Sequence, residues 1–357
     1  MKIYIDEQIP MLADILGKEE EVETFNGREI RRDDLDDAKA IFVRSTTKVD
    51  EVLLDETPVE LVGSATSGID HLDTGWLERN DIEFGDAKGS NANSVAEYVI
   101  YSMLKYSYSN RMRFNSLTIG VIGYGEVGSR VVDYANKFGL KILVNDPPKK
   151  DDNYDFPDHV KYTTKVDIFK NADIITNHVP LYTDGKYKTH SIICDDFFKQ
   201  IKKKCLLIHT SRGKVVDEKD LIRYLDRRDI TPVIDVWQNE PQADETIAKQ
   251  CMIATPHIAG YSYEGKLRGF RDMVRLYEEY FDKKVDSSVL DEKLSEYEPM
   301  PDERFNDPWY IYNILKRSRK IDQDHKNFME IFNKTEIERR DAFDELRKTY
   351  PERHEKL

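Results

Sequence analysis

The glycine pattern Gly123-Tyr-Gly-Glu-Val-Gly128 restricts the fold of this chain more than any other feature of its sequence. It follows the apolar run Thr118–Ile122 and opens a segment with helical spacing over Val127–Phe138. Between a strand and a helix, the first glycine permits a tight turn, the second (Gly125) lets the backbone approach a pyrophosphate, and the third lets helix and strand pack closely. The pattern therefore predicts a dinucleotide-binding β–α unit.

The start of this helix and the end of the next strand indicate which dinucleotide binds. The backbone N–H groups of Glu126 and Val127 stand at the helix N-terminus, where unpaired donors and the helix dipole favour a phosphate. The next predicted strand ends at Asp146, 18 residues after Gly128. A carboxylate there accepts both ribose hydroxyls of NAD and repels the additional phosphate of NADP. Because no arginine directly follows Asp146, we expect NAD as the cofactor.

Short apolar runs alternate with helical segments along most of the chain. These runs are nearly continuous in apolar residues, as in strands buried on both faces of a parallel sheet. The sequence therefore predicts an α/β fold of two doubly wound parallel-sheet domains, a Rossmann NAD domain inserted in a flavodoxin-like substrate domain. The predicted strands are Lys2–Asp6, Ala40–Ser45, Leu61–Thr66, Thr118–Gly123, Lys141–Asp146, Ile174–Val179, Cys205–Ser211, Thr231–Trp237 and Met252–Thr255.

Two long helical segments, Asn93–Asn110 and Ser262–Lys283, mark the predicted domain boundaries, and a shorter helix is predicted over Asp217–Arg228. The chain would enter the NAD domain through the first long helix and leave it before the second, which makes the substrate domain discontinuous. We therefore expect four segments. They are the first part of the substrate domain over 1–92, the NAD domain over 93–258, a return helix over 259–285 and a small C-terminal dimerisation segment over 286–357.

Charge and composition disfavour several classes of partner. The chain carries 54 basic and 68 acidic side chains, a net charge of −14, which opposes non-specific binding to nucleic acid or to an anionic membrane. Its three cysteines, Cys194, Cys205 and Cys251, form no C-x-x-C pair, so neither a disulfide framework nor a metal site is predicted. The sequence starts without an apolar signal region, and no apolar run approaches the ~20 residues that span a bilayer. We expect a cytoplasmic protein.

Three further motifs supply the groups that oxidation of a 2-hydroxy acid requires. A base must accept the hydroxyl proton, a partner must tune that base, and a fixed cation must hold the carboxylate. The motifs are Thr210-Ser-Arg-Gly213, Asp235-Val-Trp-Gln-Asn-Glu-Pro241 and Thr255-Pro-His-Ile-Ala-Gly260. With Arg, Glu and His in this order, the sequence resembles the D-isomer-specific 2-hydroxyacid dehydrogenases.

The resemblance implies a role for each of these side chains. Arg212 would clamp the carboxylate and carbonyl, for which a planar guanidinium is better suited than an ammonium group. His257 would act as the general acid and base, and Glu240 would hydrogen-bond its imidazole and stabilise the protonated form. The resemblance also places Thr210, Ser211, Asp235, Gly260 and the backbone of Val179 beside the cofactor.

Five further strings resemble the branch of this family that oxidises a phosphorylated 2-hydroxy acid to the 2-oxo acid. They lie at Ile5–Pro10, Val43–Val49, Gly63–Asp73, Pro180–Thr189 and His257–Gly269. The match implies that Ser45, Thr66 and Tyr261 contact the substrate. A phosphorylated substrate needs local cations in an acidic chain, and we hypothesise that Arg44 and Arg268 bind the phosphate. Lys48 and Lys266 are alternatives that could equally be solvated surface charges.

The C-terminal tail Ile311–Leu357 is predicted to be helical and resembles the end of a dimerisation segment, so we expect a homodimer. Arg347 is expected to be a solvated helix charge rather than part of a partner's active site. Two other functions stay open from the sequence. One is another dehydrogenase of the same family, acting on glycerate, lactate or phosphoglycerate, and the other is an NAD-sensing transcriptional corepressor with the same fold.

Overall fold

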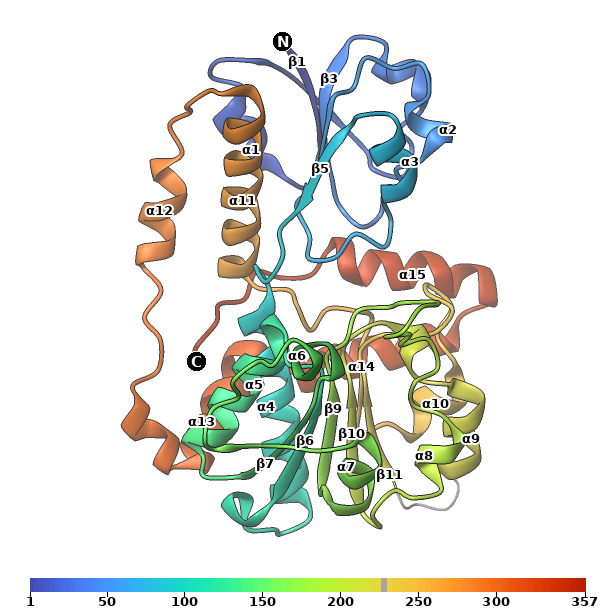
Figure 1. Ribbon diagram of the computed structural model, residues 1–357, viewed down its shortest axis with the longest axis vertical. Helices are drawn as coiled ribbons and strands as arrows, with labels where there is room; N and C mark the ends of the chain where they lie inside the picture. Colours follow the sequence, from blue (N-terminus) through green and yellow to red (C-terminus); the bar gives the residue numbers. More distant parts are fainter. Residues whose placement is uncertain (226–229) are drawn as a thin grey trace. The chain divides into compact units, whose positions relative to one another are not determined.

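The computed structural model describes residues 1–225 and 230–357. Its contacts divide the chain into two compact units (Figure 1). Unit 1 comprises Met1–Asn91 and Ser262–Glu298, and unit 2 comprises Ala92–Tyr261 and Pro299–Leu357. Unit 1 is therefore discontinuous in sequence, and the chain crosses between the units at residues 91–92, 261–262 and 298–299.

Unit 1 contains a five-stranded parallel sheet in the order β2-β1-β3-β4-β5, the flavodoxin-like order. Successive residues of its central strands alternate between two apolar clusters, so both faces are buried, which explains the continuous apolar runs. Its strands are β1 (Lys2–Asp6), β2 (Glu21–Phe25), β3 (Ala38–Val43), β4 (Leu61–Ser64) and β5 (Glu83–Asp86). Its main helices are α1 (Pro10–Leu16), α2 (Glu51–Leu54), α3 (Thr74–Arg79), α11 (Tyr263–Phe281) and α12 (Ser288–Ser295).

Unit 2 contains a seven-stranded parallel sheet in the order β12-β11-β10-β9-β6-β7-β8. The strand order reverses between β6 and β9, the crevice in which doubly wound sheets bind ligands. Its strands are β6 (Thr118–Ile122), β7 (Lys141–Asn145), β8 (Val160–Tyr162), β9 (Ile174–Asn177), β10 (Cys205–His209), β11 (Ile230–Ile234) and β12 (Ile253–Ala254). Its helices before the tail are α4 (Ala92–Ser109), α5 (Glu126–Lys137), α6 (Pro147–Asp151), α7 (Lys165–Asn171), α8 (Asp195–Phe198), α9 (Glu218–Leu225) and α10 (Glu245–Gln250).

The two parallel sheets confirm the predicted fold class. The described part of the predicted helix Asp217–Arg228 is α9, and residues 226–229 lie outside the described residues. Three strands escaped prediction: β2, β5 and β8. Each contains exposed or half-buried positions and lies at or near a sheet edge, so its apolar signal is weak. Several predicted strands also end earlier, which leaves Ser45 and Thr66 on the loops that follow β3 and β4.

The C-terminal tail divides between the units, although the sequence predicts one separate segment over 286–357. Helix α12 belongs to unit 1, whereas α13 (Pro308–Arg319), α14 (Ile321–Met329) and α15 (Glu336–Lys348) belong to unit 2. Figure 1 shows α13 beside α4, and the stacked rings of Tyr101 and Tyr312, 5.5 Å apart, join these two helices. The last residue, Leu357, is buried in the core of unit 2. The end of the tail is thus an integral part of unit 2.

Candidate active site

The turn after β6 has the geometry that a dinucleotide needs. Gly123 adopts a φ of 90°, in the left-handed region that favours glycine. A Cβ on Gly128 would lie 2.0 Å from the carbonyl oxygen of Gly123, so only glycine lets α5 start this close to the strand. A Cβ on Gly125, by contrast, would meet nothing within 4 Å. The space beside the N-terminus of α5, at Glu126 and Val127, is therefore open where a pyrophosphate would bind.

Two other predicted cofactor residues, Asp146 and Thr210, directly follow strands β7 and β10 of the same sheet. Asp146 caps α6, and its carboxylate accepts hydrogen bonds from the backbone N–H of Lys149 at 3.0 Å and of Tyr124 at 2.7 Å. These bonds hold the carboxylate against the glycine turn, and its further lone pairs can accept ribose hydroxyls. The hydroxyl oxygen of Thr210 is buried and has no hydrogen-bond partner among the described residues.

The predicted acid–base pair is assembled in unit 2. His257 Nδ1 lies 2.8 Å from Glu240 Oε2, and the other oxygen, Oε1, accepts the backbone N–H of Trp237 at 2.9 Å. Because an ionised carboxylate can only accept, Nδ1 carries the proton and Nε2 is left for a reacting hydroxyl. His257 has a φ of 59°, an uncommon conformation for a residue other than glycine, and such strain is concentrated at functional sites.

Electrostatics couple the two members of this pair. Burial acts to lower the pKa of His257, but the charge of Glu240 and the hydrogen bond to it prevail, so the pKa is raised. Burial acts to raise the pKa of Glu240, and the interaction with His257 again prevails, so this pKa is lowered. Glu240 is therefore ionised at neutral pH, and the raised pKa of His257 favours its protonated form.

Asp235 fixes the loop that carries His257. Its side chain is buried and accepts hydrogen bonds from the backbone N–H of Ile258 at 2.8 Å, that of Ala259 at 3.0 Å and the Thr255 hydroxyl at 2.6 Å. Its own backbone carbonyl accepts the N–H of His257 at 2.7 Å. The sequence places Asp235 beside the cofactor, whereas in the structure its carboxylate faces the loop from 255 to 259. This organising role was not predicted.

Arg212 lies on the loop that follows β10, and contacts with neighbouring segments hold this loop in place. A Cβ on Gly213 would lie 1.9 Å from the carbonyl oxygen of Trp237, so glycine is required where the loops after β10 and β11 meet. Buried His209 approaches the Gly213 carbonyl through Nε2 at 3.3 Å and Asn177 through Nδ1 at 3.2 Å, and Asn177 in turn accepts the Ser211 hydroxyl. The loops that carry Arg212, Glu240 and His257 follow the carboxyl ends of the adjacent parallel strands β10, β11 and β12. They therefore begin at the same edge of the sheet.

In unit 1, the predicted substrate residues lie on loops after strand ends. Ser45 is exposed, and the Thr66 hydroxyl lies 3.2 Å from Ser64 Oγ. The Arg44 guanidinium donates to the side chain of Gln8, and Arg268 Nε donates to the Ser90 carbonyl at 2.8 Å. These hydrogen bonds help to fix the positions of both guanidinium groups.

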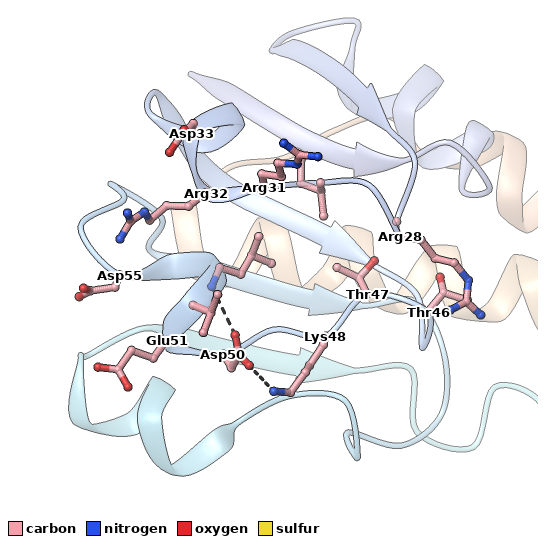
Figure 2. A pocket seen from close by; sticks show the side chains of 14 residues that line it. Arg28, Arg31, Arg32, Asp33, Thr46, Thr47, Lys48, Asp50, Glu51 and Asp55 are labelled. Atoms are coloured by element: carbon pink, nitrogen blue, oxygen red, sulfur yellow. Dashed lines mark hydrogen bonds and ion pairs between the residues drawn. The ribbon is translucent and has the colours of Figure 1, made fainter. Parts of the chain in front are cut away.

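Unit 1 also contains a pocket of about 870 Å³ next to the loop that follows β3 (Figure 2). Thr46, Thr47 and Lys48 line it, but Arg44 and Ser45 do not. Its charged lining is balanced, and Lys48 already pairs with Asp50. The charged side chains around it are Arg28, Arg31, Arg32, Lys48, Asp33, Asp50, Glu51 and Asp55. This balance offers a phosphate no net attraction.

Comparison with known proteins places the chain in a family. The profile of the D-isomer specific 2-hydroxyacid dehydrogenase NAD binding domain matches residues 100–259. Erythronate-4-phosphate dehydrogenase from Escherichia coli O139:H28 is 38% identical over 281 residues, 78% of this chain and 73% of that protein. The enzyme of the same name from Bacteroides thetaiotaomicron is 37% identical over 273 residues, 76% of this chain and 77% of that protein. The chain belongs to the D-isomer-specific 2-hydroxyacid dehydrogenases, in the group of the erythronate-4-phosphate dehydrogenases.

Solved structures of the family share the fold. D-lactate dehydrogenase from Aquifex aeolicus, complexed with NAD and lactic acid, superposes with a TM-score of 0.64 and 23% identity, covering 78% of this chain and 95% of that one. The cofactor-bound 3-phosphoglycerate dehydrogenase of Entamoeba histolytica gives 0.66 and 23%, covering 79% and 96%. The family assignment, the NAD-binding domain and the glycine turn establish an NAD-dependent oxidoreductase.

Arg347 of this dehydrogenase is not the solvated helix charge that the sequence predicts. Its side chain is partly buried on α15, and its Nε is buried without a hydrogen-bond partner. The residue hydrogen-bonds the side chain of Tyr261, and its charge acts on both Glu240 and His257. Nothing in the sequence indicates this placement, because 86 positions separate Arg347 from Tyr261 and no motif links the two.

The described residues contain neither a metal-binding cluster nor a helix that could span a membrane. Within residues 1–225 and 230–357, no group of three or more His, Cys, Asp or Glu side chains could hold a metal ion. In the same ranges, every helix is too short or too polar to cross a bilayer. The cysteines Cys194, Cys205 and Cys251 are free thiols, and burial raises the pKa of Cys205 and Cys251 far above their ordinary value.

Proposed function

We propose that the chain oxidises 4-phospho-D-erythronate with NAD to 3-hydroxy-2-oxo-4-phosphooxybutanoate, a step of pyridoxine 5'-phosphate biosynthesis. The hydrogen-bonded pair of His257 and Glu240, on loops of the same sheet as Arg212, is the observation that carries the reaction type. The choice of substrate rests on the curated relatives, which are named erythronate-4-phosphate dehydrogenases and are 37–38% identical to this chain.

In this reaction, His257 Nε2 accepts the proton of the C2 hydroxyl as the carbonyl forms, and Glu240 stabilises the resulting imidazolium. Arg212 holds the substrate carboxylate and polarises the developing carbonyl by bidentate hydrogen bonding. NAD, held by the residues named below, would supply the acceptor for the hydride that leaves C2. The reverse reaction uses the same groups, with His257 donating the proton.

The residue assignments extend this proposal to the ligands. Ser45, Thr66 and Tyr261 would contact the substrate, and Arg44 and Arg268 would bind its phosphate. Asp235 would act on the cofactor site through the loop that it organises. The residues proposed to contact NAD are Gly123, Gly125, Glu126, Val127, Gly128, Asp146, Val179, Thr210, Ser211 and Gly260. Val179 offers only its backbone and an apolar side chain.

A steady-state assay tests the proposal. NADH formation should be fast with 4-phospho-D-erythronate and much slower with D-glycerate, D-lactate or 3-phosphoglycerate. The variant His257→Asn should lose at least about a hundredfold in kcat while it retains NAD affinity, because it removes the base and leaves the glycine turn intact. Preferred turnover of an unphosphorylated acid would refute the substrate. NAD binding without turnover of any hydroxy acid would favour a corepressor.

We also propose that the protein is a homodimer in the cytoplasm. Large apolar side chains are exposed on the C-terminal helices, with Trp309 of α13 at 54% and Ile337 of α15 at 77%, as on surfaces that bind another chain. Light scattering coupled to size exclusion should give about twice the chain mass of 41.8 kDa. A monomer at micromolar concentration would contradict this.

A further inference from the structure

The inner face of helix α15 carries one apolar and one charged residue. Phe343 is fully buried, and its ring contacts that of Phe328 at 5.8 Å. Arg347 follows four residues later, one helical turn along, and therefore lies on the same face. The start of the helix is fixed by a capping box between Thr335 and Glu338. The buried side of α15 thus places a guanidinium against the rest of unit 2.

The end of α15 is anchored beside the loop that follows His257. The ring of Tyr350 meets that of Tyr261 edge to face, with centroids 5.5 Å apart. The Tyr350 hydroxyl donates to Asp324 at 3.3 Å, and Arg353 binds the same carboxylate through two nitrogens at 2.5 and 2.6 Å. These contacts hold the segment just after Arg347 in place.

The groups that act on the Arg347 guanidinium include Tyr261 and Glu240 of the candidate site, besides Asp344 of its own helix. Arg347 hydrogen-bonds the side chain of Tyr261, and its charge acts on both Glu240 and His257. Its Nε is buried with no hydrogen-bond partner among the described residues. A buried donor without a partner is unfavourable, so a structural role alone leaves this placement unexplained.

We propose that Arg347, contributed by the C-terminal helix of the same chain, is a positioning residue of the active site that orients Tyr261 and keeps His257 able to accept a proton. The inference rests on the proposed function only in that His257 is the acid–base group. It assigns a positioning role within its own chain to a segment that the sequence linked chiefly to dimerisation.

The charge balance around His257 explains why such a residue is useful. Glu240 and Asp235 favour the imidazolium, whereas burial and the charge of Arg347 oppose it. In the oxidation direction the imidazole must be neutral before the hydroxyl proton is transferred. Without a nearby cation, the carboxylates would keep more of the enzyme in the protonated, inactive form. Loss of Arg347 should therefore raise the pKa of His257 further.

The test is the pH profile of kcat/KM for oxidation at saturating NAD. Arg347→Met keeps the stem of the side chain and removes the charge. Its acidic limb should shift to higher pH, with about a tenfold loss of kcat/KM at the acidic end, the effect expected of one nearby charge. Arg347→Lys retains the charge and should keep the limb near that of the wild type, with a lower kcat because Tyr261 is less well oriented.

The matched control is Arg340→Met, an exposed arginine on the same helix, which should leave the profile unchanged. An unshifted limb in Arg347→Met, or an equal shift in Arg340→Met, would overturn the proposal. If Arg347→Met does not fold, as judged by NAD binding, Arg347→Gln removes the same charge with a polar head group. A wild-type chain that prefers another 2-hydroxy acid refutes the proposed substrate, and the test then runs on that acid, because His257 titrates in either reaction.

Discussion

The loops at the carboxyl ends of the two parallel sheets are built differently. In unit 2, the loops with Arg212, Glu240 and His257 rest on buried polar groups, and Asp235 alone accepts three side-chain hydrogen bonds. In unit 1, the loops after β3 and β4 have more exposed positions, among them Ser45. The difference matches two tasks. Proton transfer requires fixed geometry, because a small misplacement costs rate, whereas recognition of a flexible substrate tolerates adjustable loops.

The largest effect should come from breaking the pair in unit 2. Glu240→Gln keeps the shape but removes the charge that stabilises protonated His257. We expect kcat to fall by at least about a hundredfold. The acidic limb of the oxidation profile should also shift to lower pH, because the pKa of His257 loses the group that raises it. This direction is opposite to that expected for Arg347→Met, so the two variants together show whether nearby charges determine the pKa of His257.

A matched carboxylate on unit 2 controls for loss of charge. Glu245 of α10 pairs with Lys249 at 2.6 Å and with Arg339 at 2.9 Å on the surface, and Glu245→Gln should retain wild-type kcat. A similar loss of kcat in both variants would show that Glu240 has no specific role. A large loss without any shift of the limb would mean that Glu240 orients His257 without tuning it.

The contrast in loop support predicts different losses of stability. Asp235→Ala leaves two backbone N–H groups and the Thr255 hydroxyl without their buried acceptor, so the free energy of unfolding should fall by about 3 kcal/mol or more. The corresponding deletion in unit 1, Ser64→Ala, removes neutral hydrogen bonds at 3.1 and 3.2 Å and should cost about 1 kcal/mol. Urea titrations followed by fluorescence measure both, and equal losses would contradict the comparison.

A smaller effect concerns recognition by unit 1. Arg268→Ala should raise KM for 4-phospho-D-erythronate by about tenfold, the loss of one charge-assisted contact, and leave KM for D-erythronate nearly unchanged. Lys266→Ala, an exposed cation two residues away on α11, serves as the control and should change neither KM by much. Equal increases of KM for both acids in Arg268→Ala would exclude a phosphate role for this arginine.

The sequence predicts the features that neighbouring residues encode and not those that depend on distant segments. The continuous apolar runs and the glycine turn determined both sheets, because burial on two faces leaves a strong signal, whereas the partly exposed strand β2 left none. Glu240 and His257 were predicted through motifs that each lie within a few residues. Arg347 and the loop-organising role of Asp235 depend on contacts between distant segments, and no local pattern encodes those.

The smallest effect concerns the histidines, seven of which lie in unit 2 and one in unit 1. Burial lowers the pKa of His209 to about 4. The folded chain therefore keeps His209 neutral at pH values where the unfolded chain binds a proton, so its contribution to stability is present above pH 6.5 and is lost as pH falls toward 4. From pH 7 to 5.5, we expect it to account for about 1 kcal/mol of lost stability.

His209→Asn removes this titrating group. Between pH 7 and 5.5, the free energy of unfolding of the variant should fall by about 1 kcal/mol less than that of the wild type, whatever the stability of the variant at pH 7. Burial lowers the pKa of His178 further, to about 3, but His178 is present in both proteins and cancels in the difference. The raised pKa of Glu97, about 7 because of burial, acts in the opposite direction and cancels in the same way. Urea midpoints at the two pH values measure the difference. If the variant and the wild type lose equal stability between the two pH values, His209 is protonated in the folded chain. The buried polar groups that support the loop of Arg212 would then include a charge.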